Sequence, residues 1–531
     1  MGEQGGIARA AAVVAAGTLV SRVLGFLRDV VVAAAFGAGL QADAFFVAFR
    51  IPNLLRRLVG EGALSPAIVP VLTESLLHPT RDEARAVARA LVSLTTLGLL
   101  GLALAGVAAA PVVVRVIAPG FAAVAEKLEL TILLTRIMFP YIFFIGLVAM
   151  SMGILNAFRH FAAPAFSPAL LNVALIASVL WLAPRLDEPV LALATGVLLG
   201  GVAQLAAQIP ALRTLRLALR PTFRFGHPAL RRIGRLMAPS ILGLAIVQLN
   251  IFISTLLASF LPEGSISYLY YADRVVELPL GVFAVALGTA VLPTLSEQAA
   301  RRDLAGLRET VTFSLRLTTF VAVPAMVGLG VLSGPIIHVL FERGEFGSAA
   351  VAGTAHALLF YAVGLWGFSA IRVLVPAFYA LQEPRAPVMA SLVALVVNAG
   401  ASLLLMGPLR HAGLALATSI AAAVNLLVLL LLLRRRLGGL GLRAVISSGA
   451  KVLLAAGIMG GVVATIAGPG SWQGAVHWGE VLRLGAAIVG GAGIFLGVCA
   501  VLRAPELAAL QGALRRRLRR RGEVMGDVQT E

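Results

Sequence analysis

The sequence predicts an all-α polytopic membrane protein, with about fourteen transmembrane helices arranged as two similar lobes and an additional C-terminal pair. Of its 531 residues, 59% are hydrophobic and only 13% are charged, and the mean hydropathy is +0.95. Soluble domains carry about 25% charged residues. Apolar stretches of about 20 residues, the length that crosses a bilayer, recur from end to end. The strands of a membrane barrel would instead alternate apolar and polar residues over about ten positions.

The expected spans follow one another with short connections, and each is an apolar stretch of roughly 20 residues or more. The first is interpreted as a retained span and not as a signal peptide, because it is long, weakly basic at its start and interrupted by charges. Pro52 is expected to kink the second span and to free backbone groups there. In order, the spans are 8–36, 41–70, 88–112, 128–157, 163–184, 189–212, 236–260, 267–293, 311–333, 350–379, 386–406, 411–433, 447–468 and 482–502.

Basic residues are distributed unequally between the two sides of the membrane. With the N-terminus placed in the cytoplasm, the cytoplasmic connections are rich in arginine, and the tail adds "RRRLRRR" (515–521). The opposite side holds little beyond Arg115, Lys127, Arg185, Arg343 and Arg410. Because cytoplasmic loops carry an excess of Lys and Arg, both termini are predicted to be cytoplasmic and the number of spans to be even. The net charge of +18 is therefore attributed to topology anchors near acidic headgroups and not to nucleic-acid binding.

Three short matches at nearly constant offset indicate an internal repeat. They pair "AIVPVLTE" (67–74) with "AVLPTLSE" (290–297), "AFRHFAAP" (157–164) with "AFYALQEP" (377–384), and Pro111 and Gly120 with Pro335 and Gly344. The offsets are 223, 220 and 224 residues, respectively. An equal and even number of spans gives both halves the same orientation. Such parallel repeats are related by an axis along the membrane normal, and transporters place the substrate site between them.

The repeat and the composition predict five segments along the chain. The basic stretch "RLALRPTFRFGHPALRRIGR" separates the halves, and the last two spans lie outside the repeat. The segments are an N-terminal six-helix lobe (1–216), a basic cytoplasmic linker (217–235), a C-terminal six-helix lobe (236–436), an extra two-helix unit (445–505) and a basic cytoplasmic tail (506–531).

Charged residues inside three of the expected spans are the main functional feature of the sequence. Each costs roughly 2.5–3.5 kcal/mol on insertion scales, and such residues usually face a cavity. Arg22 and Asp29 are seven residues apart and share a helix face, and Arg22 lies deep in its span. The set comprises Arg22, Arg28 and Asp29 in span 8–36; Asp43, Arg50, Arg56 and Arg57 in span 41–70; and Asp273, Arg274 and Glu277 in span 267–293.

These charges predict a water-filled central cavity with a net positive charge between the halves. Arginine suits a phosphate or diphosphate, because its planar fork makes bidentate charge-assisted hydrogen bonds and stays charged. The residues alone leave a structural alternative open. In that alternative, Arg22 with Asp29, and Arg274 with Glu277, are ion pairs that hold helices together.

Enzymatic and metal-binding functions have little support in the sequence. A Walker A sequence, an H-E-x-x-H motif and a credible dinucleotide fingerprint are absent, so ATP hydrolysis by this chain is not expected. The 7 histidines are scattered and Cys499 is the single cysteine, so neither a metal site nor an internal disulfide is expected. The chain is therefore predicted to be a transporter without a catalytic site or an organic cofactor.

The sequence resembles the bacterial MurJ (MviN) family over nearly its whole length. The resemblance is carried by "SRVLGFLRD", "ADAFFVAFRIPNLLRRLVGEGALSPAIVPVL", "APGF", "SYLYYADRVVELPLGVFAVALGTAVLPTLS" and "GPLRHAGLALA". It implies membership of the multidrug/oligosaccharidyl-lipid/polysaccharide exporter superfamily and an architecture of fourteen spans that includes two six-span lobes. It also implies a flippase that moves lipid II, the undecaprenyl-diphosphate-linked peptidoglycan precursor, from the cytoplasmic to the periplasmic face, with roles in cell-wall biogenesis and cell shape.

The resemblance also implies roles for individual residues. The arginines expected to hold the diphosphate are Arg22, Arg28, Arg56 and Arg274. The polar residues expected to line or gate the cavity are Asp29, Asp43, Ser267 and Glu277, with Arg50 where a basic residue is expected. The last two spans match an extra pair that forms a hydrophobic groove for the polyprenyl tail.

Ion coupling carries over less cleanly. Some family members bind sodium with the help of carboxylates, whereas the corresponding positions in this chain have none. These positions are Asn250, Asn398, Ser402 and Thr418. Sodium is therefore one candidate for coupling, and the membrane potential, worth about 2.3 kcal/mol per charge and 100 mV, is the other.

The expected setting is the bacterial cytoplasmic (inner) membrane, with lipid II and bilayer lipids as partners and peptidoglycan synthesis and division enzymes as further candidates. Two related alternatives are a flippase for another polyprenyl-diphosphate oligosaccharide and a cation-coupled drug exporter of the same superfamily. The arginine excess argues against the exporter, because a site for cationic drugs would offer acids and aromatics. A non-transporting scaffold for envelope enzymes is disfavoured by the charges in the transport region.

Overall fold

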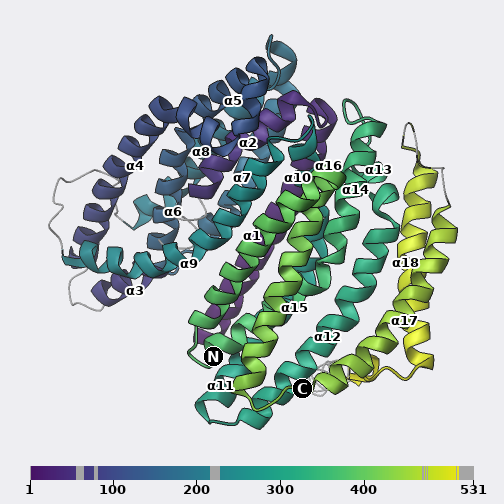
Figure 1. Ribbon diagram of the computed structural model, residues 1–531. Helices are drawn as coiled ribbons and strands as arrows, with labels where there is room; N and C mark the ends of the chain where they lie inside the picture. Colours follow the sequence, from purple (N-terminus) through teal and green to yellow (C-terminus); the bar gives the residue numbers. More distant parts are fainter. Residues whose placement is uncertain are drawn as a thin grey trace, which may run out of the picture. The chain divides into compact units, whose positions relative to one another are not determined.

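A computed structural model of the chain describes residues 2–55, 65–76, 82–215, 228–468, 472, 474, 476–509 and 511–512. Their regular secondary structure is entirely helical, which confirms the predicted fold class (Figure 1). Within these ranges ten helices are long and apolar enough to cross a membrane, or eleven if the bent pair α14–α15 is one span. The expected total of about fourteen spans stays a prediction.

The chain divides into two compact units, Met1–Tyr270 with Arg343–Ala350, and Tyr271–Glu342 with Val351–Glu531. Helix α10 begins in the first unit and ends in the second. The expected lobe boundaries stay a prediction, and residues 217–227 of the expected linker lie outside the described residues, as does the tail from 513 onward.

The helices of the first unit are long and mostly apolar. They are α1 (Gly2–Phe36), α2 (Leu40–Leu55), α3 (Ser65–Leu76), α4 (Asp82–Ile117), the 3-10 turn η2 (Pro119–Ala123), α5 (Ala125–Met138), α6 (Tyr141–Ala157), α7 (Ala162–Ala177), the π turn η3 (Ser178–Leu182), the 3-10 turn η4 (Ala183–Arg185), α8 (Leu191–Thr214), α9 (Pro228–Ala258) and the start of α10 (Ser265–Pro279).

The second unit continues the chain with a similar composition. Its helices are the end of α10, the π turn η5 (Leu280–Ala284), α11 (Val285–Ala300), α12 (Leu304–Val331), α13 (Ser333–Phe341), α14 (Ser348–Val363, from Val351 onward), α15 (Leu365–Ala380), α16 (Arg385–Arg436), α17 (Leu442–Ala467) and α18 (Trp478–Val501).

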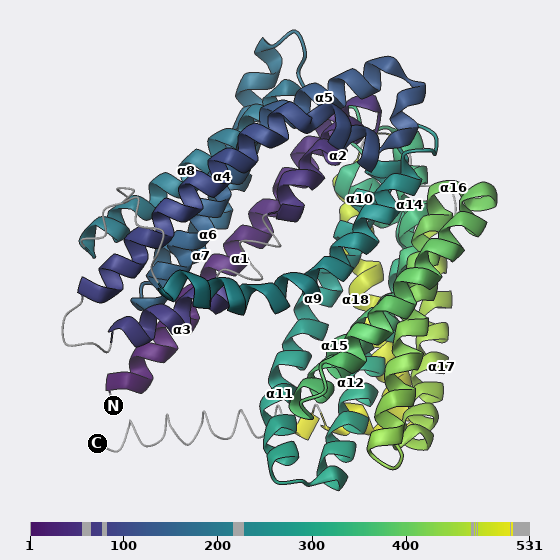
Figure 2. The ribbon, with the colours of Figure 1, turned by 60° about the vertical axis from the view of Figure 1, so that its left-hand side comes forward.

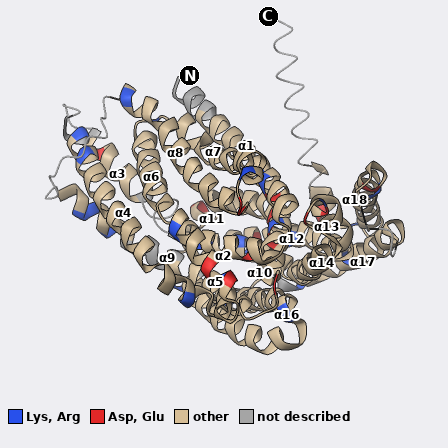
Figure 3. Cartoon of the chain, turned by 90° about the horizontal axis from the view of Figure 1, so that it is seen from above, with Lys and Arg blue, Asp and Glu red and all other residues tan. Residues whose placement is uncertain are grey.

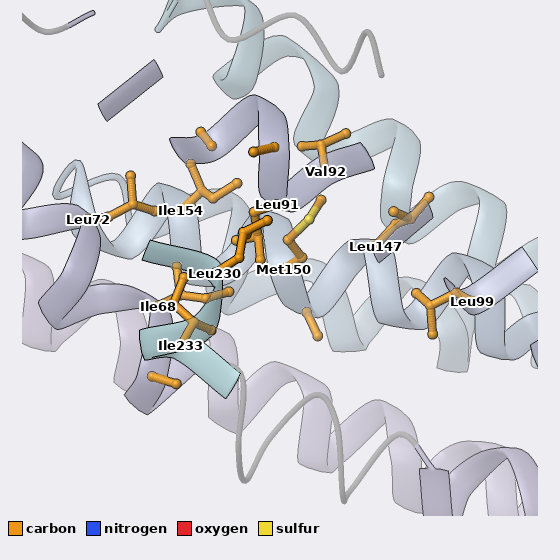
Figure 4. Packing of buried hydrophobic residues seen from close by; sticks show 14 of the residues in the cluster. Ile68, Leu72, Leu91, Val92, Leu99, Leu147, Met150, Ile154, Leu230 and Ile233 are labelled. Atoms are coloured by element: carbon orange, nitrogen blue, oxygen red, sulfur yellow. The ribbon is translucent and has the colours of Figure 1, made fainter. Parts of the chain in front are cut away.

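An apolar cluster holds α3, α4, α6 and α9 of the first unit together. Ile68, Leu72, Met150 and Ile154 are almost fully buried within it (Figure 4). Small residues allow α4 and α6 to approach closely, since a Cβ added at Gly146 would lie 2.2 Å from a methyl group of Leu99. Helices in membranes commonly use such small residues at their contacts, because lipid offers no hydrophobic drive for association.

A second cluster joins α11, α12, α15 and α16 of the second unit, with Leu307, Phe378 and Leu433 fully buried. Helix α17 packs on α12 and α18 packs on α17, so the last two helices lie along one side of this unit (Figures 1 and 2). The additional C-terminal pair expected from the sequence is therefore a pair of adjacent helices attached through α12.

The helices do not follow the expected spans one for one. The expected spans 386–406 and 411–433 both lie in α16, which is interrupted at Arg410 with φ 51° and ψ −132°. The expected span 350–379 is bent by 44° between α14 and α15. The expected span 41–70 is helical at both ends, in α2 with Pro52 inside it and in α3, and its middle lies outside the described residues.

The ends of α6 and α15 have the same backbone geometry. In each, a residue with positive φ (Arg159, 60°; Gln382, 59°) follows the helix, and the next amide N–H reaches back five residues to a carbonyl. These equivalent residues are 223 positions apart, the offset of the first sequence match, and not the 220 of the "AFRHFAAP" match. The cap geometry thus gives an offset that agrees better with the other repeat matches than the offset from the amino-acid match does.

The same cap ends α11, where Arg302 has φ 57° and the preceding Arg301 has φ −78°. We expect Arg302→Gly to raise the free energy of unfolding by about 0.5–1 kcal/mol, because glycine adopts positive φ without the steric cost of a Cβ. The matched control Arg301→Gly should lower it by about 1 kcal/mol, because its conformation is helical. Thermal unfolding of the purified variants measures both, and equal effects of the two changes would contradict this interpretation.

Candidate functional site

Arg28 lies at the centre of a polar cluster within the first unit, between α1, α7 and the start of α10. Its guanidinium donates to the Asp29 carboxylate over 2.6 and 3.0 Å and to Asn172 Oδ1 over 3.0 Å. The Tyr270 hydroxyl lies 3.2 Å from both Arg28 and Asp29. Most of the chain is uncharged (Figure 3), and α7 carries no charged residue, so on that side Arg28 meets the neutral Asn172.

The Arg28 cluster is enclosed. The side chains of Arg28 and Asp29 are only 12% and 4% exposed. Asn172 donates to the Ser21 carbonyl, and the Tyr270 ring stacks on Phe46 with centroids 3.9 Å apart. The cavity beside Arg28 and Asp29 has a volume of about 10 Å³, which is room for about one water molecule. In this geometry the charge of the Arg28 guanidinium is balanced by Asp29, and little of the side chain is accessible to solvent.

A second polar cluster surrounds Asp43 of α2. Its carboxylate accepts hydrogen bonds from Lys127 Nζ (2.7 Å), Gly264 N (2.9 Å), Ser267 N (2.9 Å) and Ser267 Oγ (2.7 Å). Gly264 has φ +87°, a conformation that lets the chain turn its amide toward the carboxylate just before α10 begins. Asp43 therefore caps α10 from another helix, where a negative charge also complements the helix dipole.

Lys127 completes this second cluster. It is 6% exposed, and its ammonium also lies 4.3 Å from the centroid of the Phe121 ring. Asp43 itself is 1% exposed. Asp43 and Lys127 thus form a buried ion pair whose remaining hydrogen-bonding capacity is filled by α10, and α2, α5 and α10 meet at this pair.

The other expected site residues occupy varied surroundings. Arg50 of α2 hydrogen-bonds Thr255 of α9, and Arg274 forms a 2.7 Å ion pair with Glu277 near the end of α10. Arg22 is exposed on α1. Arg56 and Arg57 lie outside the described residues. Asp29 pairs with its neighbour Arg28, whereas sequence spacing alone had suggested Arg22 as a partner.

The four expected ion-site residues divide between the two units. Asn398 Nδ2 donates to Thr418 Oγ1 over 3.2 Å, and Ser402 Oγ donates to Asn398 Oδ1 over 3.3 Å, all within α16. Asn250 lies on α9 of the first unit. No group of three or more His, Cys, Asp or Glu side chains able to hold a metal occurs in the part of the chain that the structure describes.

Three residues of these two polar clusters, Lys127, Asn172 and Tyr270, are not among the candidate site residues expected from the sequence. Lys127 directly precedes the expected span 128–157, so the sequence predicts it to lie in a connection. Asn172 and Tyr270 are neutral, whereas the expected site is based mainly on charged residues within the spans. The available signal was the rarity of polar residues in apolar helices, since such residues need partners there.

A third cluster, in the second unit, joins α13 to the start of α18. His338 is fully buried and contacts Glu342 through Nδ1 and Glu480 through Nε2, the latter over 3.0 Å. Glu480 also accepts from the His477 amide, which caps α18. Burial lowers the pKa of His338, but the hydrogen bonds and charges of Glu480 and Glu342 outweigh it and raise the pKa above its ordinary value.

Comparison with known proteins identifies relatives over most of the chain. Residues 32–482 match the family described as "Lipid II flippase MurJ". The chain is 41% identical over 428 residues to a probable lipid II flippase MurJ of Vibrio cholerae, covering 78% of this chain and 81% of that protein. It is 39% identical over 432 residues to the lipid II flippase MurJ of Burkholderia cenocepacia, covering 81% and 84%.

Solved structures give a consistent result. A lipid II flippase MurJ in an inward closed conformation is 26% identical with a TM-score of 0.75, covering 92% of this chain and 98% of that one. An inward-facing multidrug resistance MATE family transporter of the MOP superfamily is 18% identical with a TM-score of 0.66, covering 78% and 94%. The second likeness shows a shared fold alone.

The Asp43–Lys127 pair predicts strong energetic coupling. We expect Asp43→Asn to lower the free energy of unfolding by about 3–5 kcal/mol, because it leaves a buried ammonium without its counter-charge. Lys127→Met should lower the free energy of unfolding by less than Asp43→Asn does, because three hydrogen-bond donors to the Asp43 carboxylate remain. The double variant should lose less than the sum of the singles, as a double-mutant cycle by thermal unfolding would measure.

The exposed pair Glu297–Arg301, at 2.6 Å on α11, is the matched control. Its coupling energy should be about 0.5 kcal/mol or less, since water screens it. A coupling no larger at Asp43–Lys127 than at the control would show that the buried pair is not an anchor.

The His338 cluster predicts a pH-dependent stability. Because its folded-state pKa is raised, His338 contributes stability that is fully present below its unfolded pKa of about 6.5 and is lost as pH rises through the folded pKa. The melting temperature of the wild type should therefore exceed that of His338→Gln most at about pH 6, and the difference should shrink toward about pH 9. The exposed His160→Gln is the control, and a difference that grew with pH would refute the assignment.

Proposed function

The chain belongs to the MurJ family of lipid II flippases, and from this premise we propose that it moves lipid II from the cytoplasmic to the periplasmic leaflet of a bacterial inner membrane by alternating access. Members of this family are transporters, so the chain is a multi-pass membrane transporter and not an enzyme. Lipid II joins a sugar-peptide headgroup to a long polyprenyl chain through a diphosphate. The headgroup crosses through the protein while most of the chain stays in lipid.

The Arg28 cluster is the observation that carries the proposed mechanism. A guanidinium inside an apolar helix needs an anionic partner, and Asp29 supplies one in the described geometry. Arg28 Nε and Nη2 both donate to a single oxygen, Asp29 Oδ1, whereas a diphosphate offers several acceptor oxygens and more charge. Asp29 therefore acts as a placeholder that balances the positive charge of Arg28 in the absence of substrate and is replaced by the diphosphate when substrate binds. This role explains why the Asp29 carboxylate lies beside Arg28, the proposed diphosphate ligand.

Access to Arg28 requires a conformational change. A cavity of about 10 Å³ admits no diphosphate, and the Tyr270 hydroxyl closes over the ion pair. Withdrawal of α10 from α1 would open the cluster, and the Asp43–Ser267 hydrogen bonds would resist or release that movement at the other end of the same helix. We propose that Asp43 and Ser267 act as a gate in this sense, and that Arg22, Arg56 and Arg274 add positive charge to the cavity when it is open.

Coupling to the membrane potential suits the residues better than coupling to sodium. Asn398, Ser402 and Thr418 satisfy one another by hydrogen bonds and offer a cation no carboxylate. A cavity with a net positive charge would instead be reset by the potential, at about 2.3 kcal/mol per charge and 100 mV. The remaining proposals are cytoplasmic termini, a polyprenyl groove along α17 and α18, and contacts with peptidoglycan synthesis and division enzymes.

The proposal predicts that two arginines are required for transport. Arg28→Ala and Arg274→Ala should each slow lipid II translocation in proteoliposomes by at least about tenfold, because each removes a charge-assisted contact to the diphosphate worth 2 kcal/mol or more. Arg434→Ala, which removes an exposed arginine at the end of α16, should transport normally.

Normal lipid II transport by both site variants would refute the role of the arginines. The same vesicles loaded with another polyprenyl-diphosphate oligosaccharide test the substrate. Equal rates for both lipids would replace lipid II specificity with a general polyprenyl-diphosphate activity, and transport of a cationic drug alone would favour the exporter.

A further inference from the structure

An apolar pocket of about 290 Å³ lies in the second unit, between η5, α11, α12 and α15. Pro279, Val282, Phe283 and Ala286 form one wall, and α12 forms the opposite wall with residues such as Val321. Val282 and Phe283 are 60% and 54% exposed, so large apolar side chains stand at its mouth. The clusters around Arg28, Asp43 and His338 contribute no residue to it, and neither do α17 and α18.

The chemistry of the walls selects an apolar ligand. The two hydroxyls that line the pocket belong to Thr318 and Ser369, and both donate to carbonyls of their own helices, at Ser314 (2.8 Å) and Leu365 (2.8 Å). Their donor capacity is thus already used. A polar ligand would lose hydrogen bonds to water in this pocket and gain few in return. A hydrocarbon chain has no such hydrogen bonds, and its transfer from water into the pocket is favourable.

The backbone explains why the pocket exists. Helix α10 passes at Pro279 into the π turn η5, and α11 continues from it. A π turn inserts an extra residue into a helix, widens it locally and is frequent at functional sites. At the same point Pro279 lacks an amide hydrogen and loosens the helix before it. The widened segment faces Ala322 and Ala325 of α12, whose small side chains leave the space unfilled.

The position of the pocket along α10 suggests its occupant. Arg274 precedes Pro279 by five residues, or about 7.5 Å along a helix. Arg274 is one of the arginines proposed to hold the diphosphate, and in lipid II the diphosphate is bonded directly to the first isoprene unit. An apolar cavity of about 150 Å³ holds one benzene molecule, which has six carbon atoms. On that scale a volume of about 290 Å³ has room for about ten carbon atoms, the content of about two isoprene units.

We propose that this η5 pocket binds the first two isoprene units of the polyprenyl chain whose diphosphate Arg274 holds, an assignment that rests on the proposed function. The pocket thereby recognises the junction between head and tail, and it does so apart from α17 and α18, which would guide the distal part of the chain. A transporter that reads both sides of the phosphate–lipid junction distinguishes its substrate from free nucleotide-linked precursors, which carry a similar headgroup diphosphate without the chain.

The test compares lipid II analogues with one headgroup and different tails. The purified wild type should bind the geranyl analogue about tenfold more tightly than the methyl analogue, because the longer chain buries apolar surface. Ala286→Phe, which fills the pocket from α11, should bring this ratio close to one and leave the affinity for the methyl analogue unchanged. Ala325→Phe, which fills it from α12, is an independent second variant.

Ala290→Phe is the matched control, since Ala290 is also an exposed alanine of α11, one turn further on and outside the pocket. It should retain the wild-type ratio. A folded Ala286→Phe or Ala325→Phe protein that keeps the tenfold ratio would overturn the assignment, and the pocket would then be a site for a bilayer acyl chain.

The methyl analogue separates this proposal from the function on which it rests. It should bind the wild type and lose affinity in Arg274→Ala. If it does not bind, or if Arg274→Ala binds it equally well, the proposed headgroup site fails, and the junction assignment fails with it. If it binds normally and only the tail ratio is unaffected by pocket filling, the junction assignment alone is wrong.

Discussion

Compensation of charge inside apolar helices is the constraint on which the rest of this structure depends. An isolated charge in lipid or in a protein interior is costly, so each buried charge must be placed beside a partner. Asp29 meets Arg28, Asp43 meets Lys127, and Glu506 meets Arg316 at 2.6 Å in the second unit. The Asp43–Lys127 pair joins α2 to α5, whereas Arg28 and Asp29 are neighbours on α1 and reach α7 and α10 through Asn172 and Tyr270. Such contacts favour particular helix neighbours and registers.

The same pairs are suited to a transport cycle. Apolar contacts between helices are numerous and individually weak, so they allow gradual sliding. A buried ion pair is either formed or broken, and breaking it is favourable only when a replacement partner arrives. A diphosphate that replaces Asp29 at Arg28 would be such a partner. Substrate binding can then shift the equilibrium toward a conformation that is seldom populated without substrate.

The sequence was sufficient for the fold class and the family, because apolar length, charge asymmetry and long specific motifs are properties of the chain itself. It also singled out Asp43 and Ser267, which the structure brings to within 2.7 Å. It could not give the partners, because a contact such as Arg28 with Asn172 joins residues 144 positions apart and depends on helix packing. The break at Arg410 and the true alignment of the Arg159 and Gln382 caps are likewise backbone properties that residue types do not determine.

Helix α10 shows why the site cannot be divided into independent parts. Ser267, Tyr270 and Arg274 stand at positions i, i+3 and i+7, so they share one face of the helix. The first hydrogen-bonds Asp43, the second closes over Arg28 and Asp29, and the third is the proposed diphosphate ligand beside the η5 pocket. A rotation of this one helix would change all of these contacts together. These residues share one face of α10, and the π turn follows that helix directly. One movement of α10 would therefore affect the proposed Asp43–Ser267 gate, the Arg28–Asp29 pair and the η5 pocket together.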